Sequence, residues 1–244
     1  MKRHIITVVF AFALQGCVTT LQMQPIKSSD QVTQYQDGAE MVISTKTNVV
    51  GARAAQNIFR ANQRPSFVIT VYNRTQIPFD FSTENISARS NIAHLKVFTH
   101  EELVEEVRRQ HAAASFMTAF AGAMQSYSAS MSGNQYYSGR TSSGTYYSGR
   151  TYNPAIAANA QAIANANTER NMQQINESAK QSMGELARSI LKRQTVMPDT
   201  WHGGYIVTEH IRLPDNGSET VTLGINIGDE AHTFTFLVSK VERK

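Results

Sequence analysis

A histidine beside a glutamate, His100-Glu101, is the pair in this chain that comes nearest to a catalytic metal motif. In the zinc-protease pattern HExxH, two histidines four residues apart on one helix hold the metal, and the glutamate acts as the general base. Val104 stands where the second histidine is needed, so one helix face offers a single imidazole. The pair therefore predicts no metal site.

Other enzyme signatures do not occur in the sequence. The chain has no GxSxG nucleophile elbow, no Walker loop and no Rossmann glycine fingerprint. The other histidines after the first seventeen residues are scattered, at His94, His111, His202, His210 and His232. The sequence thus predicts a protein that is not an enzyme and holds no metal or cofactor. An active site that the fold assembles from dispersed histidines and carboxylates is the open alternative.

The first seventeen residues end in the run Leu14-Gln15-Gly16-Cys17. Two basic residues precede an apolar stretch at 5–14, and a positive segment followed by roughly 7 to 15 apolar residues is typical of an export signal. The run resembles the lipobox of bacterial lipoproteins, whose cysteine is acylated before the signal is removed. The resemblance implies a signal peptide at 1–16 and a lipid on Cys17.

Cys17 is the only cysteine, so its acylation leaves no thiol for a disulfide or a metal site. In the lipoprotein class an aspartate after the cysteine indicates inner-membrane retention, and Val18 in that place favours the outer membrane, at its periplasmic face or at the cell surface. Removing Lys2 and Arg3 with the signal lowers the formal charge from +4 to +2, which gives no reason to expect nucleic acid as a partner.

The organisation expected for the mature chain is α+β. A polar stretch at 17–38 predicts a flexible tether. Alternating apolar residues predict an antiparallel β-sandwich, immunoglobulin-like or related, from 39–98 and 199–244. The strands are expected at 40–46, 66–73, 77–81, 85–88, 93–98, 203–211, 219–227 and 231–241, with a short helix near 52–60.

A long antiparallel helical hairpin is predicted as an insertion at 99–198. Thr99 and Glu102 match a capping box, so the first helix should begin there and end by Gly133. The second should run from Pro154 to about Thr195. Between them, 134–153 is a low-complexity tip. The residues expected to face the second helix recur at intervals of four and three: Leu103, Val107, Gln110, Ala114, Met117, Ala121 and Met124.

The part of the hairpin nearest the tip is nearly free of charge. No acidic residue occurs between Glu106 and Glu169, and the only charges from 112 to 168 are Arg140 and Arg150. Ala114, Thr118 and Gly122 have the small-xxx-small spacing of closely packed helices. We expect a contact surface for copies of the chain or for an envelope partner or membrane, although a self-sufficient Ala-rich spike is the alternative. Its candidate residues are Met117, Phe120, Ala121 and Met124.

The tip contains five of the nine tyrosines and the repeated run YYSGRT, and a sixth, Tyr127, lies shortly before it. Tyrosine with serine, glycine and arginine supplies large amphipathic contacts and adaptable hydrogen bonds. The candidate residues here are Tyr136, Tyr137, Arg140, Tyr146, Tyr147 and Arg150. A disordered loop made by a short duplication is the competing interpretation. Trp201, the only tryptophan, is expected to fill the end of the sheet.

Taken together, the sequence predicts a non-enzymatic lipoprotein anchored in the outer membrane by its lipid, with a structural or assembly role. Its helical hairpin would contact other copies or a partner protein of the envelope. The alternative function is a module that binds glycan or lipopolysaccharide through the tyrosine- and arginine-rich tip.

Overall fold

The computed structural model describes residues 19–36, 39–142, 146–214 and 217–241. The expected signal peptide and Cys17 lie outside the described residues. The chain divides into two compact units, one of Met1–Val97 with Arg193–Lys244 and one of Phe98–Lys192. The described part of the chain is mixed α/β, with two α-helices and antiparallel sheets, as predicted.

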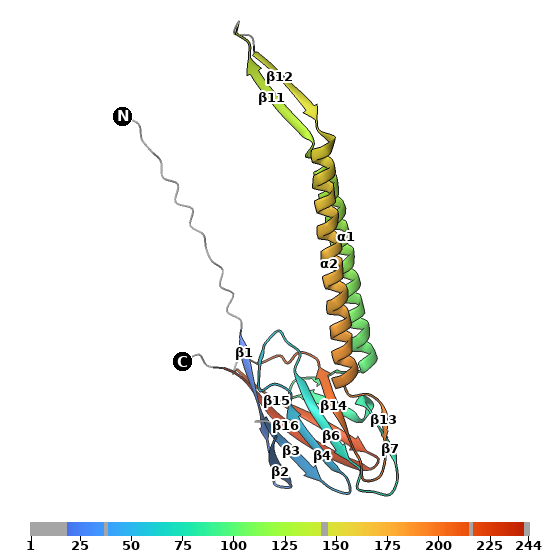
Figure 1. Ribbon diagram of the computed structural model, residues 1–244. Helices are drawn as coiled ribbons and strands as arrows, with labels where there is room; N and C mark the ends of the chain where they lie inside the picture. Colours follow the sequence, from blue (N-terminus) through green and yellow to red (C-terminus); the bar gives the residue numbers. More distant parts are fainter. Residues whose placement is uncertain (1–18, 37–38, 143–145, 215–216, 242–244) are drawn as a thin grey trace, which may run out of the picture. The chain divides into compact units, whose positions relative to one another are not determined.

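The first unit is built from two six-stranded sheets (Figure 1). One contains, in spatial order, β5 (Ile58–Arg60), β1 (Thr20–Ile26), β16 (Glu230–Lys240), β15 (Ser218–Ile227), β8 (Ile86–Ser90) and β9 (His94–Leu95). The other contains β10 (Val97–Phe98), β14 (Trp201–Thr208), β6 (Ser66–Tyr72), β4 (Val49–Ala54), β3 (Ala39–Thr45) and β2 (Gln31–Gln36). A separate short pair joins β7 (Phe79–Phe81) to β13 (Gln194–Val196), and a 3-10 turn η1 (Thr83–Asn85) precedes β8.

Alternating burial along the strands produces the core of this unit. Every second residue of β15 and β16 is buried, in register across their antiparallel pairing. β6 of the other sheet buries Phe67, Ile69 and Val71 in the same way. The rings of Phe67 and Phe236 meet across the sheets with centroids 5.0 Å apart. The sheets therefore pack face to face as a sandwich.

The prediction of a tether at 17–38 is wrong for the described residues. β1 pairs with both β16 and β5, and it buries Leu21 and Met23 to 1% exposure. β2 pairs with β3. Leu21 and Met23 alternate with glutamines, so the stretch has the period of a strand in spite of its polar composition.

The short helix expected near 52–60 is also wrong, because this region forms β4 and β5. β4 pairs with β3 and β6 in the middle of its sheet and buries Val50, Ala52 and Ala54. Alanine is a good helix former in isolation. Here the tertiary pairing on both sides of β4 determines the conformation.

The second unit contains α1 (His100–Met131), α2 (Pro154–Ser189) and a β-hairpin of β11 (Asn134–Arg140) and β12 (Tyr146–Tyr152). The capping box at Thr99 is present: its hydroxyl accepts from Glu102 N, and Glu102 Oε2 accepts from Thr99 N. Asn153 caps α2, with proline in the first turn. α2 ends before the predicted Thr195 because Gln194–Val196 form β13.

Figure 1 shows α1 and α2 side by side, with β11 and β12 at the ends where α1 stops and α2 starts. The low-complexity tip therefore contains paired strands rather than an irregular loop. A backbone hydrogen bond from Asn153 N to Gly133 O closes the base of this β-hairpin. Of the described helices, none has a segment of the length and hydropathy needed to cross a bilayer.

Candidate interaction surfaces on the helical hairpin

The two helices approach each other through small residues. Gly122 of α1 and Ala157 and Ala164 of α2 are buried between them. A Cβ added to Gly122 would lie 2.4 Å from Thr168 Oγ1, so glycine is required for this approach. Further along the same seam, the Ser126 hydroxyl donates to Asn165 Oδ1 at 2.9 Å. The small-xxx-small spacing predicted through Ala114, Thr118 and Gly122 therefore lies on the side of α1 that faces α2, and Gly122 is its most buried residue.

The large apolar side chains of α1 point the other way. We define the α1 stripe as the exposed residues Phe116, Met117, Phe120, Met124, Tyr127 and Met131. At about 100° per residue they share an arc of roughly 100° on the helix. Phe120 and Gly122, two residues apart, lie about 200° from each other. The stripe therefore occupies the side of α1 opposite to α2.

This arrangement corrects the predicted helix–helix seam. Met117 and Met124 were expected to face the second helix, but they are 62% and 57% exposed, and Ala121 is exposed as well. The actual seam passes through Thr118 and Gly122, one residue further along. The expectation failed from Met117 onward, where it included two methionines, whereas close backbone packing selects small residues.

The candidate residues of α1 thus form one outward surface. Met117, Phe120 and Met124 lie on the stripe, and Ala121 lies beside it. The part of α1 from 112 onward is uncharged and exposes several phenylalanine and methionine side chains together. Contiguous exposed apolar surface of this kind marks contact sites.

The β-hairpin arranges the candidate residues of the tip on two faces. In its register Tyr136 is opposite Arg150, and Arg140 is opposite Tyr146. Directly opposite residues of an antiparallel pair share a face. We define the Tyr/Arg face as Tyr136, Arg140, Tyr146, Arg150 and Tyr152, all of which are exposed. The repeat produces this order, because each copy of YYSGRT places its first tyrosine across from the arginine of the other copy.

The other face of the β-hairpin contains Tyr137, whose ring lies across Gly149. A Cβ added at Gly149 would be 2.4 Å from Tyr137 Cζ. The register likewise pairs Gly139 with Tyr147. The glycine of each repeat therefore lies opposite a tyrosine of the other, and the structure brings Tyr137 to the face opposite to Tyr136 and Arg140.

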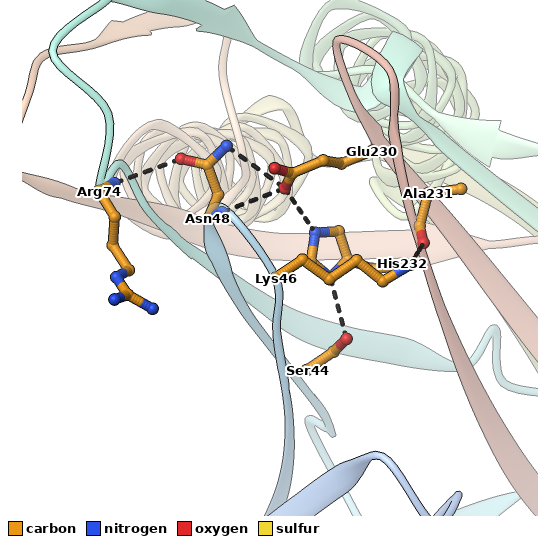
Figure 2. A network of polar contacts seen from close by, with 7 residues as sticks. All are labelled: Ser44, Lys46, Asn48, Arg74, Glu230, Ala231 and His232. Atoms are coloured by element: carbon orange, nitrogen blue, oxygen red, sulfur yellow. Dashed lines mark hydrogen bonds and ion pairs between the residues drawn. The ribbon is translucent and has the colours of Figure 1, made fainter.

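The sandwich contains a polar network that the sequence patterns did not reveal (Figure 2). His232 of β16 has Nδ1 3.0 Å from Ser44 Oγ of β3 and Nε2 3.3 Å from Glu230 Oε2. Because an ionised carboxylate only accepts hydrogen bonds, Nε2 carries the proton and Nδ1 accepts from the serine hydroxyl. Glu230 Oε2 also accepts from Asn48 N at 3.1 Å.

Burial lowers the pKa of His232 and outweighs the Glu230 carboxylate, which raises it. Burial alone would raise the pKa of Glu230, but hydrogen bonds from Thr47, Asn48 and His232 bring it below its usual value. The network therefore holds a neutral histidine beside an ionised glutamate.

The order Ser44, His232, Glu230 is that of a nucleophile, a base and an orienting acid. Ser44 is 3% exposed and His232 is 1% exposed, so a substrate has no access to the serine oxygen. The network joins a strand of one sheet to a strand of the other. A buried histidine that alternates with apolar residues on β16 was the only signal for it in the sequence.

The remaining predicted chemical groups are not brought together. In unit two, His100 Nδ1 lies 3.7 Å from Glu101 Oε1, and its buried Nε2 has no hydrogen-bond partner in the described part of the chain. The described residues contain no cluster of three side chains suited to a metal ion.

Trp201 does not fill the end of the sheet as expected. It is exposed on β14 and packs against Tyr72 of β6 in a tilted ring pair, with ring centroids 4.8 Å apart. The two residues are opposite each other in the register of these strands.

Comparison with protein-family models, with curated proteins and with solved structures finds no match to this chain. Inferences about function therefore depend on the residues and their geometry.

Proposed function

We propose that this protein is an outer-membrane lipoprotein of the bacterial envelope with a structural or assembly role, and that copies of the chain associate through the α1 stripe. The observation that supports association is the inverted packing of the hairpin, with small side chains between the helices and large apolar ones toward solvent. The anchor is proposed from the resemblance of Leu14-Gln15-Gly16-Cys17 to a lipobox. An immunoglobulin-like type for the sandwich is part of the same proposal.

A second copy of α1 is the occupant that suits the stripe best. Phe116, Phe120, Met124, Tyr127 and Met131 recur at intervals of four and three, which is the spacing by which helices pack in coiled coils. The sequence has no charged residue from 112 to 139, so two such helices bury no like charges against each other. Burial of the six side chains between two copies would remove their apolar surface from water. This burial stabilises the contact by about 25 cal/mol for each Å² of apolar surface.

Cysteine cross-linking in isolated membranes tests the copy-to-copy contact. Met117→Cys places a thiol on the stripe. Ala162→Cys is the matched control on the outward side of α2, since it lies two residues from buried Ala164 and is exposed. The parent chain, with Cys17 alone, reports any background.

A disulfide-linked species of twice the chain mass is expected for Met117→Cys and for neither control. Monomers in all three samples would contradict association. Adducts of Met117→Cys with a different protein would assign the stripe to an envelope partner instead.

Fractionation of a Cys17→Ser variant tests the anchor. Loss of the lipid should release the chain from the membrane fraction, and mass spectrometry of the parent should show a mature chain that begins at Cys17 with acyl groups attached. A parent chain that begins at Met1, or a variant that still sediments with membranes, would refute the lipoprotein assignment.

A further inference from the structure

We infer that the Tyr/Arg face of the β11–β12 hairpin binds a lipid surface with anionic phosphate headgroups. The inference concerns a different surface from the α1 stripe and does not depend on self-association. It begins from the register, which places both arginines of the tip on one face, each opposite a tyrosine.

The spacing of the two arginines follows from the pairing. Tyr136 and Arg140 are four residues apart on β11, and Arg150 lies opposite Tyr136. At about 3.3 Å per residue, the two guanidinium groups are attached roughly 13 Å apart along the strands. Ser138 and Ser148 are paired between them on the same face. The face therefore has a cation near each end and hydroxyl groups between.

No acidic residue lies near Arg140 or Arg150 in the sequence. Glu106 and Glu169 are the nearest acidic residues on either side. Along the helices, Glu169 is fifteen residues from Pro154 and Glu106 twenty-five from Met131, which corresponds to about 23 and 38 Å. Both distances exceed the screening length of about 8 Å at physiological salt. The charges of this unit therefore make the field at the Tyr/Arg face positive.

The residue types match a phosphate-bearing membrane surface. The planar guanidinium of arginine binds phosphate oxygens through two hydrogen bonds. Tyrosine, with an apolar ring and a polar hydroxyl, is enriched where a protein meets lipid headgroups. Tyr136, Tyr146 and Tyr152 supply three such rings beside the two arginines, and all three are exposed.

A neutral glycan fits this face less well. Sugar hydroxyl groups are commonly bound by carboxylate and amide side chains together with an aromatic platform, whereas this face has no carboxylate. Two arginines on one small face would gain no ion pair from a neutral sugar. The charge of the face thus favours a lipid phosphate over a neutral glycan.

Vesicle co-sedimentation tests the inference on residues 17–244 with Cys17→Ser, so that no acyl chain contributes. One set of vesicles contains phosphatidylcholine alone, and the other contains phosphatidylcholine with phosphatidylglycerol. Binding is expected to the anionic set and should weaken with added salt. It should persist when inorganic phosphate replaces part of the salt at the same ionic strength.

Arg140→Gln with Arg150→Gln removes the two charges. Each arginine near an anionic surface is worth about fivefold in affinity, so the double variant should lose about 25-fold. Arg108→Gln with Arg109→Gln is the matched control: both residues are exposed on α1, outside the uncharged stretch, and the change in net charge is the same. This control should change binding less than twofold.

Several results would overturn the inference. These are equal binding to neutral and anionic vesicles, equal losses in the two double variants, competition by free phosphate at constant ionic strength, and retention on peptidoglycan sacculi that depends on Arg140 and Arg150. The Met117→Cys cross-link should persist in the Arg140→Gln, Arg150→Gln background. Failure of one proposal is therefore distinguishable from failure of the other.

Discussion

Replacing Gly122 with alanine is expected to destabilise the helical hairpin, although alanine is the better helix former. At an open helix position this change stabilises by roughly 1 kcal/mol. At Gly122 the new Cβ would lie 2.4 Å from Thr168 Oγ1 and 2.6 Å from Thr168 Cγ2. Thr168 is held in place because its hydroxyl donates to Ala164 O at 3.0 Å. Overpacking of this kind costs about 1–3 kcal/mol, so we expect a net loss of about 1 kcal/mol.

Gly184→Ala is the internal control for this experiment. Gly184 lies on α2, and a Cβ added there meets no atom within 4 Å. Its replacement should stabilise by about 1 kcal/mol, which separates the two variants by about 2 kcal/mol. Urea unfolding of residues 17–244, followed by the helical circular dichroism signal, measures both free energies of unfolding.

A second substitution identifies the cause. Thr168→Ala removes both of the atoms nearest to the added Cβ, so it should relieve the clash in the double variant with Gly122→Ala. A favourable coupling on the order of 1 kcal/mol is expected between the two sites. The reasoning is refuted if Gly122→Ala is as stable as Gly184→Ala, or if the effects at Gly122 and Thr168 simply add.

Two further outcomes concern the sandwich. Burial lowers the pKa of His232, so the folded chain keeps this histidine neutral while the unfolded chain takes up a proton below about pH 6.5; the free energy of unfolding should therefore fall as the pH drops from 7 through 6.5 toward the folded pKa. His232→Gln should reduce this pH dependence in urea titrations, and an unchanged slope would count against a buried neutral imidazole. Phe236→Ala should cost about 3–5 kcal/mol, because Phe236 is fully buried against Phe67. Ile77→Ala, at an exposed position, should stay within about 0.5 kcal/mol in the same assay.

The sequence was sufficient to predict an element where one residue pattern outweighed the alternatives. The alternation in β6, β15 and β16 predicts strands, since each buries one complete face. The capping box at Thr99 predicts where α1 begins, because its two reciprocal hydrogen bonds are local and need no tertiary partner.

The sequence was insufficient to predict the conformation of a segment where its pairing with distant strands determines that conformation. β1 has the period of a strand, but its glutamines resemble a tether until β16 and β5 are placed on either side. β4 contains two alanines, which favour a helix in isolation. In the tip, the repeat shows that two segments are alike, whereas only the register shows that Arg140 and Arg150 share a face.

The error in the helix–helix seam bears on the mechanism of association. Turning α1 by about one residue would bring Met117 and Met124 toward α2 and bury more apolar area inside a single hairpin. Side chains of that size would also hold the helix axes further apart. Gly122 fits against Thr168 only in the observed rotation, so the glycine that permits close packing also keeps the α1 stripe outward. The unfolding test at Gly122 and the cross-linking test at Met117 are therefore linked. If Gly122→Ala forces α1 to turn, the Met117→Cys cross-link between copies should weaken when both substitutions are present.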